Sequence, residues 1–268
     1  MNENVRLVIF DWAGTTVDFG CMAPAVVFKK VFEQKKIYLS KEEILKPMGM
    51  EKKDHIRELL KLDHVTVDWK KEQGYEWTEN DVDEMYLIFE AMLSDIVADY
   101  SVVIPGVEET ISQLKEEGIK IGSTTGYTRE IMDRVLAKAA EGGYSPDYLV
   151  TPDVVGSGRP GPFMIYENMR QAGIYPISSV VKVGDTTMDI SEGVNAGVWT
   201  VGILEGSSLA GLSQEEAEQM SDAEKTVLYE QAEKKYREAG ADYVIRNITE
   251  LPNIIKLINK SFDRKENK

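Results

Sequence analysis

The chain has 268 residues, of which 43% are hydrophobic and 29% charged, and its formal net charge is −15 at pH 7. These values are ordinary for a globular protein with one large domain or two smaller ones. The strong negative charge argues against a nucleic-acid or anionic-membrane surface, so an anionic substrate needs a local positive pocket or a metal ion. The single cysteine, Cys21, excludes an internal disulfide. With no apolar run near ~20 residues and no signal-like N-terminus, we expect a cytoplasmic protein.

The chain begins with an apolar run, Leu7-Val8-Ile9-Phe10, that predicts a buried strand ending at Asp11. From residue 19 to 103 the pattern becomes helical and contains no convincing strand. The predicted helices span residues 23–34, 41–46, 52–62 and 81–100. Ser40 and Glu43 form a capping box at the start of the second of these helices. A helical block placed directly after the turn of the first strand is an insertion, and we expect it to form a cap domain over the site.

From Pro105 onward, helical and strand patterns alternate, which is typical of βαβ units in a parallel sheet. The predicted strands span residues 120–125, 148–150, 180–183, 199–203 and 242–245. The predicted helices span residues 107–117, 128–140, 162–172, 187–196 and 251–259, with an acidic helical tail over 207–240 and a frayed terminus over 260–268. We therefore expect an α/β core with a doubly wound parallel sheet, formed by residues 1–18 and 104–268, and a helical cap formed by residues 19–103.

Four short motifs occur near the ends of predicted strands, the edge where open α/β sheets bind ligands. They are Asp11-Trp12-Ala13-Gly14-Thr15-Thr16, Gly122-Ser123-Thr124-Thr125-Gly126-Tyr127, Gly158-Arg159-Pro160 and Val183-Gly184-Asp185-Thr186-Thr187-Met188-Asp189. Each motif alone has an ordinary structural explanation, such as a strand that ends in a turn or a charge at the start of a helix. The complete set in this order is much harder to explain without a function.

In that order the motifs resemble those of the haloacid dehalogenase-like superfamily. The resemblance implies that Asp11 attacks phosphorus and that Thr125, Gly126 and Arg159 bind the phosphoryl group. The pattern departs from the phosphatases of the superfamily at Ala13, where they carry a second Asp as the general acid.

The same resemblance implies a Mg²⁺ site. Asp185 would bind the ion beside Asp11 and the carbonyl oxygen of Ala13. Asp189, one helical turn after Asp185, is expected in a supporting role in which it orients a water molecule or Thr186. The alternative for Asp189 is a plain N-terminal helix charge, because acidic groups there interact favourably with the helix dipole.

In the cap, Lys46-Pro47-Met48-Gly49 and Lys52-Lys53-Asp54-His55 narrow the resemblance to the phosphonoacetaldehyde hydrolase family. The resemblance implies that Lys52 forms a Schiff base with the substrate aldehyde, although spacing alone leaves Lys53 open. A protonated imine accepts the electrons of a breaking P–C bond, so no acid is needed at Ala13. His55 lies on the same helical face as Lys52 and could tune its amine or shuttle protons. The resemblance also places Cys21, Met48 and Tyr127 near the site, where each could equally be a packing residue.

The resemblance implies the hydrolysis of phosphonoacetaldehyde to acetaldehyde and phosphate, with Mg²⁺, in phosphonate degradation. The resemblance further implies a homodimer joined through the caps. Two alternatives stay open. A phosphate-ester phosphatase or phosphomutase is disfavoured by Ala13, and a silent phosphometabolite-binding protein is disfavoured because nucleophile, cation and both carboxylates of the last motif are present.

Overall fold

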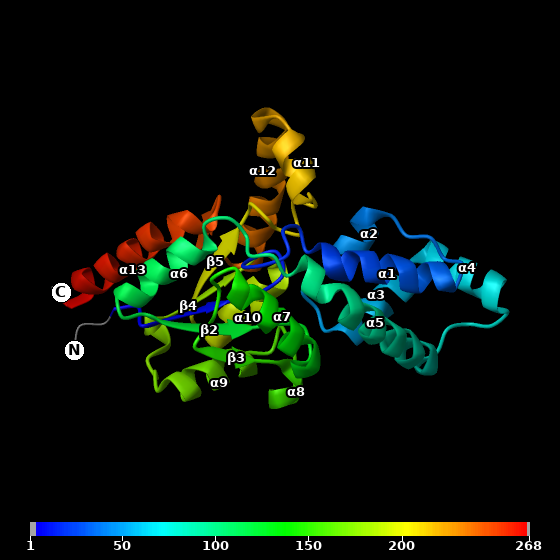
Figure 1. The fold of residues 1–268 in the computed structure, drawn as a ribbon, viewed down its shortest axis with the longest axis horizontal. Helices are drawn as coiled ribbons and strands as arrows, with labels where there is room; N and C mark the ends of the chain where they lie inside the picture. Colours follow the sequence, from blue (N-terminus) through cyan, green and yellow to red (C-terminus); the bar gives the residue numbers. More distant parts are fainter. Residues whose placement is uncertain (1–3, 267–268) are drawn as a thin grey trace.

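In the computed structural model, which describes residues 4–266, six parallel strands form one sheet in the order β3-β2-β1-β4-β5-β6 (Figure 1). The strands are β1 (Leu7–Phe10), β2 (Lys120–Thr124), β3 (Tyr148–Val150), β4 (Val180–Gly184), β5 (Trp199–Ile203) and β6 (Tyr243–Ile245). Each lies within one residue of its predicted bounds. The predicted doubly wound α/β fold is therefore confirmed.

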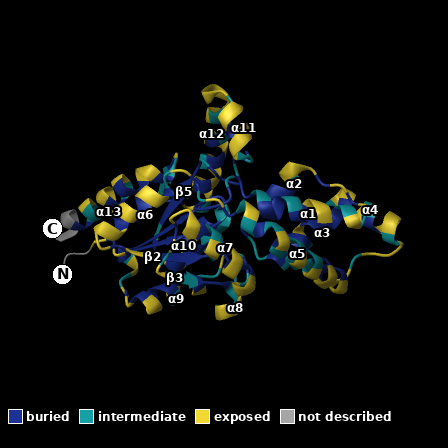
Figure 2. Cartoon of the chain, in the orientation of Figure 1, coloured by how far each residue is buried: buried dark blue, intermediate teal, exposed yellow. Residues whose placement is uncertain are grey.

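Strand β1 is apolar throughout because both faces of the sheet are covered. Leu7 and Ile9 pack with residues of helix α9 (Phe163–Ala172) on one face. Val8 and Phe10 belong to the main core on the other face, which also includes residues of α6 (Val107–Glu116) and α13 (Leu251–Glu266). Figure 2 shows the resulting buried strands between partly exposed helices. A parallel strand covered on both sides has no polar face, as the unbroken apolar run predicts.

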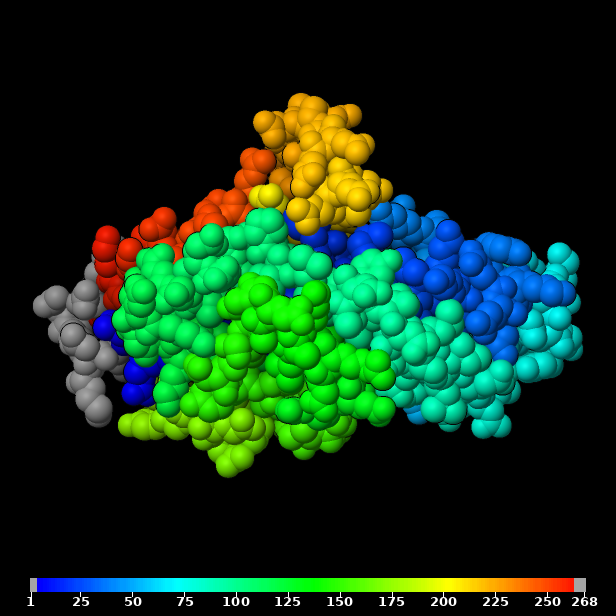
Figure 3. All heavy atoms as spheres, viewed as in Figure 1, coloured from blue at the N-terminus to red at the C-terminus, as the bar shows by residue number. Residues whose placement is uncertain are grey.

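The remaining helices fall into two groups. The part of the chain that contains β2 to β6 also includes the helices α7 (Arg129–Glu141), α8 (Pro152–Val155), α10 (Thr187–Ala196), α11 (Gln214–Gln219) and α12 (Asp222–Ala239). The helical insertion consists of α1 (Met22–Gln34), α2 (Lys41–Leu45), α3 (Lys52–Leu60), α4 (Asp63–Gln73) and α5 (Glu79–Tyr100). It extends to one side of the sheet (Figures 1 and 3), and α5 packs against α7. The predicted capping box of Ser40 and Glu43 is present at the start of α2.

Several predictions of helix extent were wrong. In the tail predicted as helical over 207–240, residues 207–213 are not helical and residues 220–221 separate α11 from α12, and the short helix α8 was not predicted. Helix α4 was not predicted, because Val65 and Trp69 are its only buried residues and give a weak apolar stripe. Of the frayed terminus predicted over 260–268, residues 260–266 are instead part of α13, and residues 267–268 lie outside the described residues. The buried Phe262 follows the buried Ile258 by four residues, so the apolar face of α13 extends past the predicted end. Among the described residues, no helix combines the length and apolar character needed to cross a membrane.

Candidate active site

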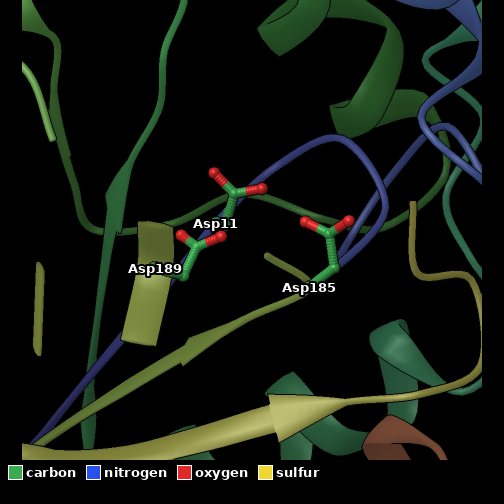
Figure 4. Close-up of side chains that lie close together, drawn as sticks. All are labelled: Asp11, Asp185 and Asp189. Carbon is green, nitrogen blue, oxygen red and sulfur yellow. The ribbon is translucent and has the colours of Figure 1, made fainter. Parts of the chain in front are cut away.

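The candidate site lies where the chain reverses its winding, between the adjacent strands β1 and β4. Asp11 follows β1 directly, and its backbone N–H donates to the carbonyl oxygen of Val183 at 2.9 Å. Asp185 directly follows β4. Figure 4 shows their carboxylates beside each other, together with that of Asp189 from α10. The parallel register thus brings carboxylates from distant motifs together at the ligand-binding edge of the sheet.

The turn after Asp11 depends on Gly14, which has a φ of +87°. A Cβ atom at this position would lie only 2.4 Å from Oδ2 of Asp185. Any other residue would therefore clash with this carboxylate and strain the backbone. Gly14 allows the loop after β1 to pass directly against Asp185.

Arg159 contacts the predicted nucleophile from the loop between α8 and α9. Its Nη2 donates to Oδ1 of Asp11 at 2.6 Å, in a buried setting. Burial raises the pKa of Asp11 above its usual range, and the guanidinium of Arg159 opposes that rise. An arginine fork in this position supplies permanent positive charge where a phosphoryl group would meet Asp11.

Asp185 is held by the loop after β5. The backbone N–H and hydroxyl of Ser208 donate to its Oδ2 at 2.9 and 2.7 Å. Its buried Oδ1 has no hydrogen-bond partner among residues 4–266. Burial, and then the charge of Asp11, hold the pKa of Asp185 well above its usual range. A buried carboxylate oxygen with no donor indicates that a positive group belongs beside it.

A divalent cation fits this set of residues. Carboxylate oxygens of Asp11, Asp185 and Asp189 lie within 4.8 Å of one another. Asp189 already has cationic partners, since its Oδ1 lies 3.0 Å from Nη1 of Arg159 and 2.8 Å from Nζ of Lys182. Burial alone would raise the pKa of Asp189, but these two cations lower it. Asp11 and Asp185 are therefore the better cation ligands, and Asp189 belongs to their support.

Asp189 also holds the start of α10. Its Oδ2 accepts hydrogen bonds from the hydroxyl of Thr186 at 2.5 Å and from the backbone N–H of Thr186 at 3.2 Å, which completes a capping box. Both expectations for Asp189 thus have a structural counterpart, the orientation of Thr186 and the charge at the helix N-terminus.

Two neighbouring threonines at the end of β2 have different surroundings. The hydroxyl of Thr124 bonds to Arg159, Lys182 and Glu192, which uses its one hydrogen and both lone pairs. Within residues 4–266, the hydroxyl of Thr125 accepts only from the backbone N–H of Tyr127, at 3.1 Å, and it lines a cavity with Asp11. Of the two hydroxyls, that of Thr125 has the capacity to donate to a phosphoryl oxygen.

Lys52 extends from α3 of the insertion into this same cavity. Only 6% of the residue is exposed, and its Nζ lies 5.4 Å from the ring centroid of Tyr127 and 5.8 Å from that of Phe28. Burial lowers the pKa of Lys52, against the opposing effects of Cys21 and Asp11. Lys53, by contrast, pairs with Asp83 at 2.6 Å and has a side chain that is 34% exposed.

His55, one turn after Lys52, is completely buried. It stacks on Phe28 with 3.8 Å between the ring centroids, and its Nε2 lies 2.9 Å from the carbonyl oxygen of Ile44. A carbonyl can only accept, so the ring carries its proton on Nε2 and leaves Nδ1 unprotonated. Burial and the nearby charge of Lys52 keep the pKa of His55 well below its usual range.

Most of these groups border a partly open cavity of about 20 Å³, which has room for about one water molecule. It brings together most of the predicted site residues from both parts of the chain. Its lining comprises Asp11, Ala13, Cys21, Met48, Gly49, Lys52, Thr125, Gly126, Tyr127, Arg159, Asp185 and Thr186. His55 and Asp189 lie outside the lining, behind Lys52 and Arg159. A larger open pocket of about 280 Å³ shares Lys52, Gly126 and Tyr127 with the cavity.

Sequence reasoning missed three residues around the site, Lys182, Glu192 and Ser208. A signal existed for Lys182, because a lysine within the apolar strand Val180–Gly184 must find a buried partner. Glu192 follows Asp189 by three residues and therefore lies on the same face of α10. Ser208 lies in an irregular loop and carries no comparable signal.

Comparison with known proteins agrees with this geometry. A sequence model of the haloacid dehalogenase-like hydrolases matches residues 5–197. The chain is 49% identical over 256 residues to a phosphonoacetaldehyde hydrolase of Bacillus cereus (strain G9842), covering 96% of this chain and 97% of that protein. It is 50% identical over 260 residues to the bifunctional phosphonoacetaldehyde hydrolase/aminoethylphosphonate transaminase of Clostridioides difficile (strain 630). That match covers 97% of this chain but only 41% of the longer protein.

A solved structure supports the same relationship. The crystal structure of a phosphonoacetaldehyde hydrolase-like protein from Oleispira antarctica superposes with a TM-score of 0.95 at 35% sequence identity, covering 98% of this chain and 95% of that one. The resemblance inferred from the motifs is thus confirmed over nearly the full length. The chain belongs to the haloacid dehalogenase-like hydrolases and, within them, to the phosphonoacetaldehyde hydrolase family.

Proposed function

We propose that this protein hydrolyses the P–C bond of phosphonoacetaldehyde and releases acetaldehyde and phosphate. The observation that carries the proposal is the shared cavity of Lys52 and Asp11, with Ala13 at the position of a general acid. A buried amine and a carboxylate nucleophile directed at one small volume suit a substrate with an aldehyde at one end and a phosphoryl group at the other.

The reaction begins at Lys52. Its neutral amine adds to the aldehyde carbon, and loss of water gives a protonated imine. Burial favours the neutral amine because it lowers the pKa of Lys52. His55, one helical turn after Lys52 and with an unprotonated Nδ1, is a candidate for moving a proton on this side of the cavity.

Asp11 then attacks phosphorus. A carboxylate oxygen forms the new P–O bond while the electrons of the P–C bond move into the imine, so the leaving group is an enamine rather than a carbanion. Arg159, Thr125 and the backbone around Gly126 bind the phosphoryl oxygens. No leaving oxygen requires a proton, which is why Ala13 is compatible with turnover.

Two hydrolytic steps regenerate the protein. The enamine takes up a proton at carbon to become an imine again, and water releases acetaldehyde from Lys52. A second water hydrolyses the aspartyl phosphate and releases phosphate from Asp11.

We assign the cation as Mg²⁺, with Asp11, Asp185 and the carbonyl oxygen of Ala13 as its protein ligands. Its chemistry would be to offset the charge of the carboxylates and of the phosphoryl group. With the Lys52 amine neutral, two buried cations, Arg159 and Lys182, lie among four buried carboxylates, those of Asp11, Asp185, Asp189 and Glu192. A divalent ion balances the two excess negative charges when all of these groups are ionised.

We also propose that the chain forms two domains, a core of residues 1–18 and 104–268 and a cap of residues 19–103. The cavity of about 20 Å³ adjoins the pocket of about 280 Å³ through Lys52, Gly126 and Tyr127, so both lie along the boundary between cap and core. Gly49 of the cap is packed directly against the core, because a Cβ there would lie 2.4 Å from Oγ1 of Thr186. We further propose a homodimer joined through the caps and a cytoplasmic location, on the family resemblance and composition respectively.

The test is a substrate panel. Phosphate release from phosphonoacetaldehyde in the presence of Mg²⁺ should greatly exceed release from sugar phosphates and simple phosphate monoesters. Comparable turnover of a phosphate ester would favour a phosphatase or phosphomutase, whereas tight phosphate binding without turnover of any substrate would favour a binding protein.

A further inference from the structure

A network of buried charges extends from Arg159, which lines the cavity beside the nucleophile, to Lys182 and Glu192. Lys182 on β4 and Glu192 on α10 both have side chains with no solvent exposure, and the Arg159 side chain is 2% exposed. Nζ of Lys182 lies 3.4 Å from Oε2 of Glu192 and 2.8 Å from Oδ1 of Asp189. Neither Lys182 nor Glu192 lines the cavity, so any effect on the reaction must pass through another residue.

That residue is Arg159, whose guanidinium is held on three sides. Its Nε donates to Oε2 of Glu192 at 3.0 Å, its Nη1 lies 3.0 Å from Oδ1 of Asp189, and its Nη2 donates to Oδ1 of Asp11 at 2.6 Å. A guanidinium is planar, so fixing Nε and Nη1 also fixes the direction of Nη2. Glu192 and Asp189 therefore determine how Arg159 meets the nucleophile.

Lys182 holds the acceptors of this fork in place. Besides its ion pairs with Asp189 and Glu192, it donates to the hydroxyl of Thr124 at 3.0 Å. The same hydroxyl accepts from Nη2 of Arg159 at 2.9 Å and donates to Glu192 at 3.1 Å. Loss of Lys182 would leave two buried carboxylates short of positive charge and one hydroxyl short of a donor.

Stability alone gives a poor explanation of this arrangement. Burial of ions is costly, and apolar residues of similar volume often serve a folded core equally well or better. The neighbours of Lys182 in β4, which include Val181 and Val183, are apolar. This ionic network includes a residue of an apolar strand and is connected to Asp11 by Arg159. Its position indicates that it orients Arg159.

We propose that Lys182 and Glu192 are positioning residues for the phosphoryl-transfer half of the reaction, and that they act by holding the Arg159 fork against Asp11. This inference rests on the proposed function for its kinetic test. Phosphoryl transfer to Asp11 depends on Lys182 and Glu192, whereas imine formation at Lys52 needs neither residue.

The first test compares three variants by kcat, KM and imine trapping. Lys182→Met and Glu192→Leu should each lower kcat for phosphate release about 10–100-fold, as loss of supporting partners does at other sites. KM should change by less than about threefold, and borohydride trapping of acetaldehyde on Lys52 should persist. Glu192→Gln restores an acceptor for Nε and should recover part of the lost kcat. The control is Lys120→Met, since Lys120 on β2 donates to the Ala172 carbonyl, outside the network, and should keep wild-type kcat.

A double-mutant cycle shows whether the effect passes through Arg159. Arg159→Lys keeps the charge but removes the fork, so adding Glu192→Leu in that background should lower kcat no further. Multiplicative losses would overturn the inference, as would trapping and kcat that fall together. Circular dichroism and urea unfolding identify variants that fail to fold, and for these Glu192→Gln carries the test.

A crystal structure of Glu192→Leu provides a readout that does not depend on the substrate. Nη2 of Arg159 should move away from its 2.6 Å contact with Asp11, and an unchanged contact would overturn the inference on its own. Absence of phosphate release from phosphonoacetaldehyde by the wild-type protein would instead count against the proposed function.

Discussion

The amine of Lys52 and the ring of Tyr127 face each other across the boundary between the helical insertion and the sheet, 5.4 Å apart. No hydroxyl partner for Tyr127 occurs among the described residues, and burial keeps the pKa of this phenol well above its usual range. The neutral ring of Tyr127 shields the Lys52 amine from water and, unlike a carboxylate, does not stabilise its positive charge by ion pairing. The amine can therefore lose its proton more easily than a surface lysine.

The first prediction concerns imine formation at Lys52. Borohydride added with acetaldehyde should reduce the imine, inactivate the protein irreversibly and add mass to one peptide containing Lys52. Lys52→Arg should lose trapping, and its activity should fall by several orders of magnitude, because a guanidinium cannot form the imine. Peptide mass spectrometry and phosphate release are the measurements.

Lys53→Arg is the matched control for that experiment, since Lys53 is the adjacent lysine and pairs with Asp83 at the surface. It should keep both trapping and turnover. A label on Lys53, or full activity without any trapping, would remove the proposed electron sink and leave Ala13 unexplained.

A second prediction is the pH dependence of trapping. Only the neutral amine reacts, so the rate should rise with pH and level off as Lys52 becomes deprotonated. Because burial lowers the pKa of Lys52, the midpoint should lie below the ordinary lysine value of 10.5. Rates measured from pH 6 to 10 with a fixed aldehyde concentration test this, and a midpoint at or above the ordinary value would contradict it.

The third prediction separates the nucleophile from the cation site. Asp11→Asn should abolish phosphate release and aspartyl-phosphate formation. Asp185→Ala should mainly weaken Mg²⁺ binding, because it removes a ligand but leaves Asp11. Calorimetric titration with Mg²⁺ and acid-quench labelling distinguish the two outcomes. Turnover by Asp11→Asn with deamidation ruled out would reassign the nucleophile.

Ala13 gives a fourth prediction, on reaction type. Phosphate monoesters need a proton on their leaving oxygen, which typically contributes ~10²–10⁴-fold to the rate. The wild-type protein should therefore hydrolyse them slowly, and Ala13→Asp should increase that activity while it leaves imine trapping in place. Monoester rates for the two proteins under identical Mg²⁺ concentrations are the measurement. Equal rates would show that the missing acid is not what limits this activity.

The fifth prediction concerns Asp18, which caps α1. Its two carboxylate oxygens accept from the backbone N–H groups of Met22 and Ala23 at 2.9 and 3.0 Å. Burial raises its pKa from 3.8 to about 7, and the two hydrogen bonds oppose that rise. Between these pH values the folded state binds more protons than the unfolded state, so Asp18 makes the free energy of unfolding decrease as pH rises from about 4 to 7.

Asp18→Asn cannot ionise and should lack that decrease. The difference in free energy of unfolding between the variant and the wild type should therefore change by on the order of 3 kcal/mol in favour of the variant between pH 4 and pH 8. Because the asparagine amide can accept only one of the two N–H bonds, the variant should start out less stable at pH 4, by about 1 kcal/mol. Urea unfolding across the pH range tests the slope, and parallel curves for the two proteins would contradict the prediction.

Sequence reasoning was most successful where the local pattern has one physical solution. The apolar run of β1 needs two covered faces, and alternating strands and helices need a parallel sheet. The meeting of Asp11 and Asp185 was expected from the family resemblance, whereas the adjacency of β1 and β4 that produces it was not predicted. Lys182 and Ser208 could not be assigned partners from sequence, because their contacts depend on how distant strands and loops pack.

Lys52 and Lys53 show the same limit within one helix. Spacing places them about 100° apart but does not say which side faces the cavity. The choice follows from packing, since Phe28 and Tyr127 enclose one lysine and Asp83 pairs with the other. Such information is absent from the helix itself.

The separation of Lys52 and Asp11 onto an insertion and a sheet has a consequence for how such proteins diversify. In the proposed reaction, the groups that bind phosphorus come from loops of the α/β core, whereas the amine that stabilises the departing fragment comes from the segment inserted between β1 and α6. An exchange of the inserted segment would therefore change which leaving group is stabilised while the groups around Asp11 stay the same. If the inserted segment lacks an imine-forming lysine, the residue at position 13, in the loop after β1, must be an acid that can protonate the leaving group.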